Sequence, residues 1–325
     1  MKTLLQKPAA PPRQKRMSLE TVSSGVERAP FRIFLYGDGG LGKSTFFAES
    51  PNAIFLDTQN GTSRIAGAHR FPQSPETWDD VLDAIDELLS RDNLPYKTFV
   101  IDIIDDVERM IWAHVCKRDG KDNIEAYGFG KGPVIALVEW RILLAKLERL
   151  RREKGMNIGI AGHMSVCKFK NPESEDYGMF GPQLHEKASG LIRGWCDTVL
   201  FARLETFAKT DANTKRTRAW STGTRLVYTS STAAFYAKNR DNLPETLPLD
   251  WAAYAEAVEA GQPVDAATLR GEIGKLLESV TSGELVDAVN AAKAACGDDP
   301  ARLMRVLTRL REKVQQIVQQ DGGTQ

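Results

Sequence analysis

Apolar residues along the chain fall into short runs, separated by longer stretches with helical periodicity. Short runs rich in Ile, Val, Leu and Phe predict buried strands at residues 31–36, 53–57, 98–102, 157–162 and 198–202. Between them, breaker-free or amphipathic stretches predict helices at residues 44–49, 78–89, 105–117, 134–154 and 184–193. Strands that alternate with helices predict an α/β fold with a mostly parallel, doubly wound sheet.

Two segments depart from this alternation. Residues 164–182 are mostly polar and predict a long loop, a kind of segment that is often functional. Residues 225–229 form an apolar run that follows a basic, turn-rich stretch. We expect this run to belong to an antiparallel hairpin that extends the sheet.

The two ends of the chain differ from its middle. Residues 1–29 contain several prolines and a basic cluster but no hydrophobic periodicity. After residue 261 the pattern predicts only helices, at residues 269–277, 285–295 and 303–318. We therefore expect three parts, a flexible arm over 1–29, a core over 30–260 and a small helical domain over 261–325.

Composition sets limits on function. The chain has 325 residues, of which 42% are hydrophobic, and carries 43 basic and 43 acidic side chains. A net charge of zero excludes general basicity as a reason to bind nucleic acid, so any such surface is local. The four cysteines form no C-x-x-C pair, and a zinc site is not expected. Neither a signal peptide nor a membrane-spanning run is visible, so we expect a cytoplasmic protein without membrane contact.

The first predicted strand leads into a glycine-rich segment that fits the P-loop pattern G-x-x-x-x-G-K-[ST]. Glycines let the backbone N–H groups turn toward phosphate oxygens, and we expect Lys43 to be a solvated ligand that reaches the outer phosphates. The Ser44 hydroxyl suits Mg²⁺. The predicted nucleotide-binding residues are Gly37, Asp38, Gly39, Gly40, Leu41, Gly42, Lys43, Ser44 and Thr45.

A carboxylate ends the third predicted strand. In a parallel sheet, the carboxyl end of that strand lies at the same edge as the P-loop, where a Walker B acid is needed. Asp102 is therefore the magnesium-shell candidate beside Ser44, with Asp105 as the second choice. The predicted cofactors are ATP and Mg²⁺.

The order of these motifs resembles a RecA-like P-loop ATPase core. More closely, it resembles the phage nucleotide-binding (AAA-domain) proteins of the Sak-type single-strand annealing and recombination group. The resembling stretches are residues 37–45, 57–64, 127–133, 162–181 and 238–244. The resemblance implies a homo-oligomeric ring or filament that binds single-stranded DNA and promotes annealing or strand exchange in a bacterial host cell. A single-stranded-DNA-binding protein is a further partner that it allows.

The resemblance also implies roles for single residues. Lys238 and Arg240 would reach a neighbouring subunit's γ-phosphate as trans-acting fingers, and His163 would sense the γ-phosphate. Residues 119–132 and 164–181 take the places of two DNA-binding loops, where lysines meet phosphates and rings stack on bases. Packing within the protein is the alternative for each ring. The implied DNA-binding residues are Lys121, Tyr127, Phe129, Lys131, Lys168, Lys170, Tyr177 and Phe180.

Gln59 departs from the resemblance, because RecA-like ATPases usually carry glutamate there as the base that activates water. Glutamine orients water but does not accept its proton. Hydrolysis is then slow, or another carboxylate serves. A non-hydrolysing, ATP-gated module that loads partners on DNA is the main alternative.

A GTPase is a further alternative, since residues 57–61 and 208–211 faintly resemble its switch and guanine motifs. Both matches are imperfect, and Asp102 has no glycine three residues later. A small-molecule kinase is disfavoured because no segment resembles a dedicated acceptor pocket.

Overall fold

The computed structural model describes most of the core and parts of both ends. The described residues are 19, 22, 29–169, 171, 175–210, 217–261, 266–278, 280, 282–299, 302–303, 305–307, 309–310 and 313–314. For residues 206–210, 217–222, 266 and 268 only the backbone is described. Nearly all of the predicted arm, Lys170 and residues 315–318 therefore lie outside the described part.

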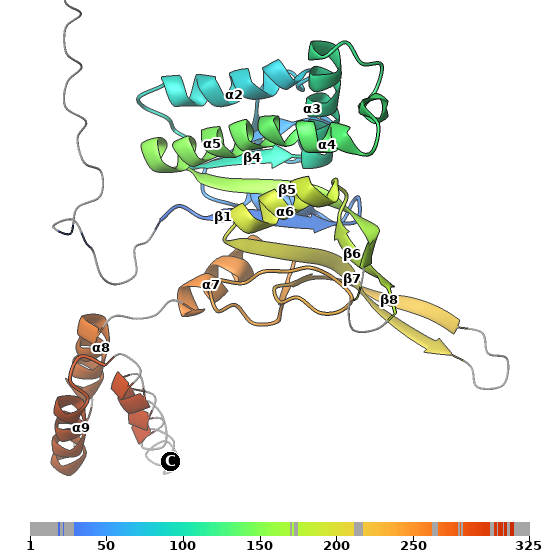
Figure 1. Ribbon diagram of the computed structural model, residues 1–325. Helices are drawn as coiled ribbons and strands as arrows, with labels where there is room; N and C mark the ends of the chain where they lie inside the picture. Colours follow the sequence, from blue (N-terminus) through green and yellow to red (C-terminus); the bar gives the residue numbers. More distant parts are fainter. Residues whose placement is uncertain are drawn as a thin grey trace, which may run out of the picture.

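One twisted sheet runs through the core (Figure 1). Its described strands follow the order β3-β2-β4-β5-β1-β7-β8-β9. In this order, the neighbouring strands β3, β2, β4, β5, β1 and β7 are parallel to one another. Strands β8 and β9 add antiparallel pairs at one edge. Their bounds are β1 Arg32–Gly37, β2 Ala53–Asp57, β3 His69–Arg70, β4 Thr98–Asp102, β5 Asn157–Phe169, β7 Thr198–Thr210, β8 Thr217–Tyr228 and β9 Thr246–Pro248.

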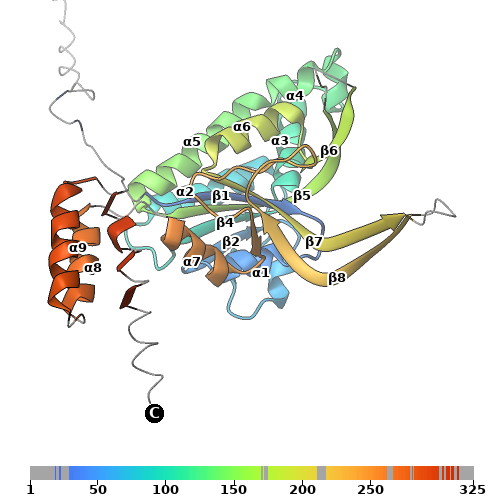
Figure 2. The same ribbon diagram turned by 90° about the horizontal axis from the view of Figure 1, so that it is seen from below.

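Helices cover both faces of this sheet, as Figure 2 shows. Because side chains alternate along a strand, Phe34 and Tyr36 of β1 join one apolar core, and Ile33 and Leu35 join the other. Helices α2 Trp78–Ser90, α3 Ile104–Arg118, α5 Leu137–Lys154 and α6 Glu186–Trp195 close the first core. Helices α1 Lys43–Ala48 and α7 Trp251–Gly261 close the second. The predicted α/β class, with a mostly parallel sheet and an antiparallel extension, is confirmed.

The predicted loop over residues 164–182 is wrong. Strand β5 continues to Phe169 and pairs antiparallel with β6 Tyr177–Pro182, so that Val166 lies opposite Phe180. Glycine permits the close pairing, since a β-carbon built on Gly181 would lie 3.0 Å from Cys167 Sγ. The polar composition concealed this antiparallel ladder.

Other boundaries shift as well. The predicted helix over 134–154 is divided between α4 Lys131–Ile135 and α5, and the predicted strand over 225–229 belongs to the longer β8. The short helical turns η2 Gly61–Arg64 and η3 Ile124–Tyr127 were not expected. Neither were β3, β9 and α7.

The C-terminal helices have an apolar core of their own. Helices α8 Ala266–Glu278 and α9 Gly283–Ala295, with described helical residues between 302 and 314, bury a shared set of side chains. This set comprises Leu269, Ile273, Val289, Leu303, Leu307 and Leu310. Among the described residues, this set shares no member with the two core clusters. A separate helical domain over 261–325 stays a prediction.

Candidate nucleotide-binding site

The P-loop joins β1 to α1 and places its glycines where the backbone turns left-handed. Gly40 has φ of 74° and Gly42 has φ of 104°, a region that side chains disfavour. Leu41, only 5% exposed, anchors the loop in the second core. The loop therefore has the backbone shape that the phosphate-binding motif requires.

Lys43 is buried, which corrects the expectation of a solvated ligand. Only 4% of the residue is exposed, and its Nζ donates to the carbonyl oxygens of Gly37 at 3.2 Å and Asp38 at 2.7 Å. Burial lowers the pKa of Lys43, while the charges of Asp102 and Asp105 oppose this shift. The ammonium is thus held against the loop, already stripped of most water.

Asp102 ends β4, 3% exposed, opposite Asp57 of β2. Burial raises the pKa of Asp102, and a hydrogen bond from the Ser44 side chain and the charge of Lys43 oppose the rise. Within the described part of the chain, Asp102 Oδ1 is buried and has no hydrogen-bond partner. A buried carboxylate oxygen without a partner, beside a serine hydroxyl, fits a hard cation such as Mg²⁺.

The described residues offer no cluster of three His, Cys, Asp or Glu side chains that could hold a metal ion alone. An ion at Asp102 and Ser44 would need further ligands from phosphate or water. Mg²⁺ in nucleotide sites is commonly bound in this way.

Asp105, the second metal candidate, has another partner. Its Oδ2 lies 2.6 Å from His163 Nδ1, and the His163 backbone N–H also points at the carboxylate at 3.2 Å. A β-carbon built on Gly39 would lie 3.9 Å from His163 Nε2, so the Nε2 edge of the imidazole lies next to the P-loop. Asp105 therefore orients His163 at the loop.

Gln59 lies just beyond β2 and is fixed by a residue that the sequence did not single out. Its Nε2 donates to Asp106 Oδ2 at 2.8 Å, and the Thr58 hydroxyl donates to the same oxygen at 2.7 Å. Arg109 forms an ion pair with Asp106. The amide oxygen is the acceptor that Gln59 still offers. The only sequence signal for Asp106 was its place among the acids that open α3.

The two predicted finger residues have different surroundings. Lys238 Nζ donates to the carbonyl oxygens of Arg193 at 2.9 Å and Gly194 at 3.1 Å, at the C-terminal end of α6. Arg240 is 57% exposed and lies 3.5 Å from Asp197. Lys238 is thus engaged within its own chain, whereas Arg240 reaches solvent.

The predicted DNA-binding residues of 119–132 are mostly exposed. Phe129, at φ of 50°, is fully exposed, and the Lys131 ammonium lies 5.9 Å from the centre of its ring. Lys121 lies at the same distance from Tyr127, whose hydroxyl is 2.7 Å from Asp119. Phe129 and Lys131 therefore remain available for contacts outside the chain.

The predicted DNA-binding residues on the β5–β6 hairpin differ in how far they are engaged within the chain. Lys168 pairs with Asp176 at 3.0 Å, and Tyr177 contacts Phe169 with 5.1 Å between ring centres. Phe180 is half-buried and stacks on Phe201. Packing accounts for Phe180.

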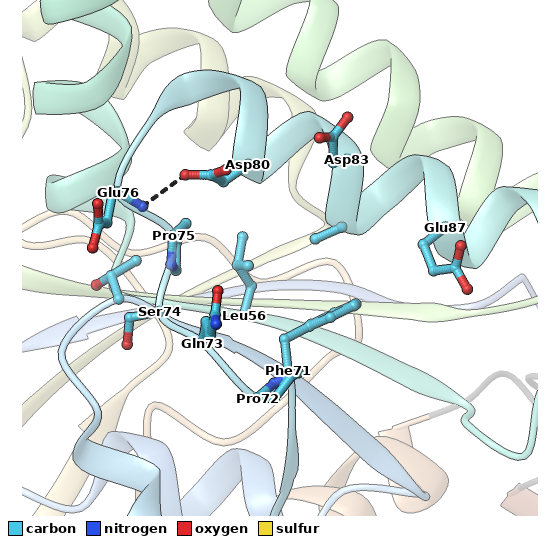
Figure 3. Close-up of a pocket in the computed structure, with 12 residues that line it drawn as sticks. Leu56, Phe71, Pro72, Gln73, Ser74, Pro75, Glu76, Asp80, Asp83 and Glu87 are labelled. Carbon is cyan, nitrogen blue, oxygen red and sulfur yellow. Dashed lines mark hydrogen bonds between the residues drawn. The ribbon is translucent and has the colours of Figure 1, made fainter.

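A cavity of about 870 Å³ lies beside the edge of the sheet, between the end of β2, residues 71–76 and α2 (Figure 3). Its wall includes Thr58, and all four charged side chains among the described residues that line it are carboxylates. These are Glu76, Asp80, Asp83 and Glu87. Their charge disfavours a polyphosphate, so the P-loop and not this cavity is the nucleotide candidate.

Most of the core matches a known protein family. A family described as an AAA domain matches residues 29–241, which include the P-loop, Asp102, His163 and Arg240. No curated protein matches the chain. Among solved structures, the crystal structure of the RadB recombinase matches at 12% identity over 62% of this chain and 80% of that chain, with a TM-score of 0.34. Among the described residues, no helix is both long and apolar enough to cross a membrane.

Proposed function

Because the chain belongs to the AAA domain family, we propose that it binds and hydrolyses ATP and acts on single-stranded DNA as an oligomer. The observation that carries this proposal is the grouping at one end of the sheet. Buried Lys43, the unpartnered Asp102 oxygen beside Ser44, and His163 oriented by Asp105 come from β4, β5 and the P-loop. Each group suits one part of a magnesium triphosphate.

The residues divide the work as follows. The loop amides bind phosphate oxygens, and Lys43 exchanges its carbonyl partners for phosphate oxygens, which bond more strongly to an ammonium. Asp102 and Ser44 would hold Mg²⁺, which neutralises phosphate charge when bound. His163, held at Nδ1, directs Nε2 toward the position of the γ-phosphate. Gln59 orients the attacking water through its amide oxygen.

The DNA-binding part of the proposal rests on continuity between the site and the exposed loops. Strand β5 carries His163 at the nucleotide end and Lys168 five residues on, about 17 Å away along an extended strand. Helix α3 begins beside Asp102 and ends at Arg118, just before the loop that presents Phe129 and Lys131. An exposed ring flanked by lysines suits unpaired bases and their phosphates.

Arg240 is the finger that we assign to the neighbouring subunit. Its exposed guanidinium can leave Asp197 for a γ-phosphate, whereas removing Lys238 would also uncap α6. Arg240→Ala should lose turnover, and mixing it with Lys43→Ala should restore part of it. Arg141→Ala, an exposed arginine on α5, is the control. Absence of rescue in proven mixed oligomers would reject the trans assignment.

The test of the whole proposal is ATP turnover with and without single-stranded DNA, with Lys43→Ala as the inactive control. Turnover that rises with single-stranded DNA is expected. A folded protein that binds no nucleotide would reject the proposal. Displacement of ATP by GTP at equal concentration would instead favour the GTPase.

A non-hydrolysing, ATP-gated module is the second candidate, and the Gln59–Asp106 contact favours it. The amide group cannot accept a proton from water, and Asp106 is already bonded to Thr58 and Gln59. Tight ATP binding without turnover, with DNA binding that depends on ATP, would select this alternative.

A further inference from the structure

An arginine far from the P-loop in sequence lies against it in space. A β-carbon built on Gly42 would stand only 3.2 Å from the Nη1 atom of Arg225. Arg225 belongs to β8, where it pairs with Leu204 of β7, and its carbonyl accepts a hydrogen bond from Leu249 N–H at 3.0 Å. The backbone of Arg225 is therefore held by β7 on one side and by Leu249 on the other, and its side chain extends to the P-loop.

The Arg225 side chain is exposed. Among the residues that the structure describes, no carboxylate pairs with Arg225, whereas Arg32 and Arg118 both bind acids. Within the described residues, no ion pair therefore accounts for the position of the Arg225 guanidinium. An exposed, unpaired cation at the edge of a phosphate-binding loop raises the local anion affinity.

Arg225 reaches the loop from the side opposite to the other charged groups. In the order β4-β5-β1-β7-β8, Asp102 and His163 come from the strands on one side of β1, and Arg225 comes from the other. A bound phosphate chain would thus lie between the Mg²⁺ side and a guanidinium.

We propose that Arg225 is a nucleotide-binding residue that acts in cis, with its guanidinium on the diphosphate part of a nucleotide held by the P-loop. This inference rests on the proposed function. Gly42 immediately precedes Lys43, and the loop amides at this point cradle the α- and β-phosphates. The planar guanidinium donates two parallel hydrogen bonds to phosphate oxygens, which a lysine ammonium does not reproduce.

The test measures displacement of a fluorescent ADP analogue by ATP, ADP and AMP. Arg225→Ala should weaken ATP and ADP by a similar factor, about tenfold or more, the effect of losing a hydrogen bond to a charged group. AMP, which lacks the β-phosphate, should change much less. Arg225→Lys should recover part of the loss.

Arg203→Ala is the matched control. Arg203 lies opposite Leu226 on the same β7–β8 ladder, so its side chain points to the face of the sheet away from Arg225. The Arg203→Ala variant should bind ATP and ADP with the affinity of the wild type. Thermal unfolding of all variants separates a loss of contact from a loss of fold.

Two outcomes would overturn the inference and are distinguishable. If Lys43→Ala abolishes binding but Arg225→Ala keeps wild-type affinity for ADP and ATP, the inference fails alone. If the wild type binds no nucleotide, the proposed function fails with it. ATP turnover of mixed oligomers also tests the cis assignment. Mixing Arg225→Ala with Lys43→Ala should restore no turnover, because each nucleotide site then lacks a residue of its own chain. Mixing Arg240→Ala with Lys43→Ala should restore part of it.

Discussion

Glu108 on α3 should make folding stability depend on pH. The residue is 6% exposed, and burial raises the pKa of its carboxyl from 4.5 to about 7, against a hydrogen bond from His185 N–H. The folded protein therefore keeps a proton that the unfolded chain releases near pH 4.5. Between about pH 4.5 and 7 the folded state binds more protons, so the free energy of unfolding falls as pH rises.

The size of the effect follows from the two pKa values. The difference between 4.5 and about 7 corresponds to about 3 kcal/mol at about 1.4 kcal/mol per pH unit. This is an upper value, since water and small movements relieve buried charge. Glu108→Gln removes the charge and keeps an oxygen that accepts from His185 N–H. It should therefore stabilise the protein by up to about 3 kcal/mol at pH 8 and have little effect at pH 5.

Urea unfolding of the wild type and Glu108→Gln at pH 5 and pH 8 measures this difference. Glu256→Gln, on the exposed face of α7, is the control and should show no pH-dependent gain. An equal effect of Glu108→Gln at both pH values, or destabilisation only at pH 8, would refute the argument that the buried charge is the cause.

Three further predictions concern the nucleotide and DNA sites. Lys43→Ala should abolish ATP binding in a titration, and because the residue is buried, circular dichroism must show a folded variant. Single-stranded DNA should slow hydrogen exchange in 119–132 and 164–181, and its affinity should fall steeply with salt; protection confined to other segments would count against these two. Gln59→Glu alone should give no gain in turnover, because the new carboxylate lies beside the carboxylate of Asp106. When Gln59→Glu is combined with Asp106→Asn, turnover should rise about tenfold, which is part of the ~10²–10⁴-fold rate increase that a well-placed base supplies. Equal rates for the single and double variants would contradict this reasoning.

The alternation of strands and helices could be predicted because the core is strongly apolar. The buried runs over 53–57 and 98–102 match β2 and β4 residue for residue. The β5–β6 hairpin was missed, since its alternating half-exposed residues include lysines, glycines and serines. Periodicity detects burial, and residues 163–169 of β5 include no fully buried residue.

The candidate site was predictable where a motif fixes its local geometry, as in the P-loop. Contacts between distant segments were not, because the sequence contains no signal for which side chains meet. Asp105 was ranked as a metal ligand, yet the structure pairs it with His163. Arg225 showed no motif at all, and only the sheet order brings it to Gly42.

The position of Gln59 shows why residue identity alone misjudges such a site. From the sequence, glutamine removes a base. In the structure, the Asp106 carboxylate accepts a hydrogen bond from the Gln59 side-chain amide, so a carboxylate is present directly beside Gln59. Asp106 thus positions Gln59, and under the proposed function Gln59, not Asp106, would contact the attacking water. A site that orients water without deprotonating it depends more heavily on stabilisation of charge on the phosphates. Cations that reach the nucleotide from β8 in cis and from a neighbour's Arg240 would supply that stabilisation, and a rate set by them would respond to assembly on DNA.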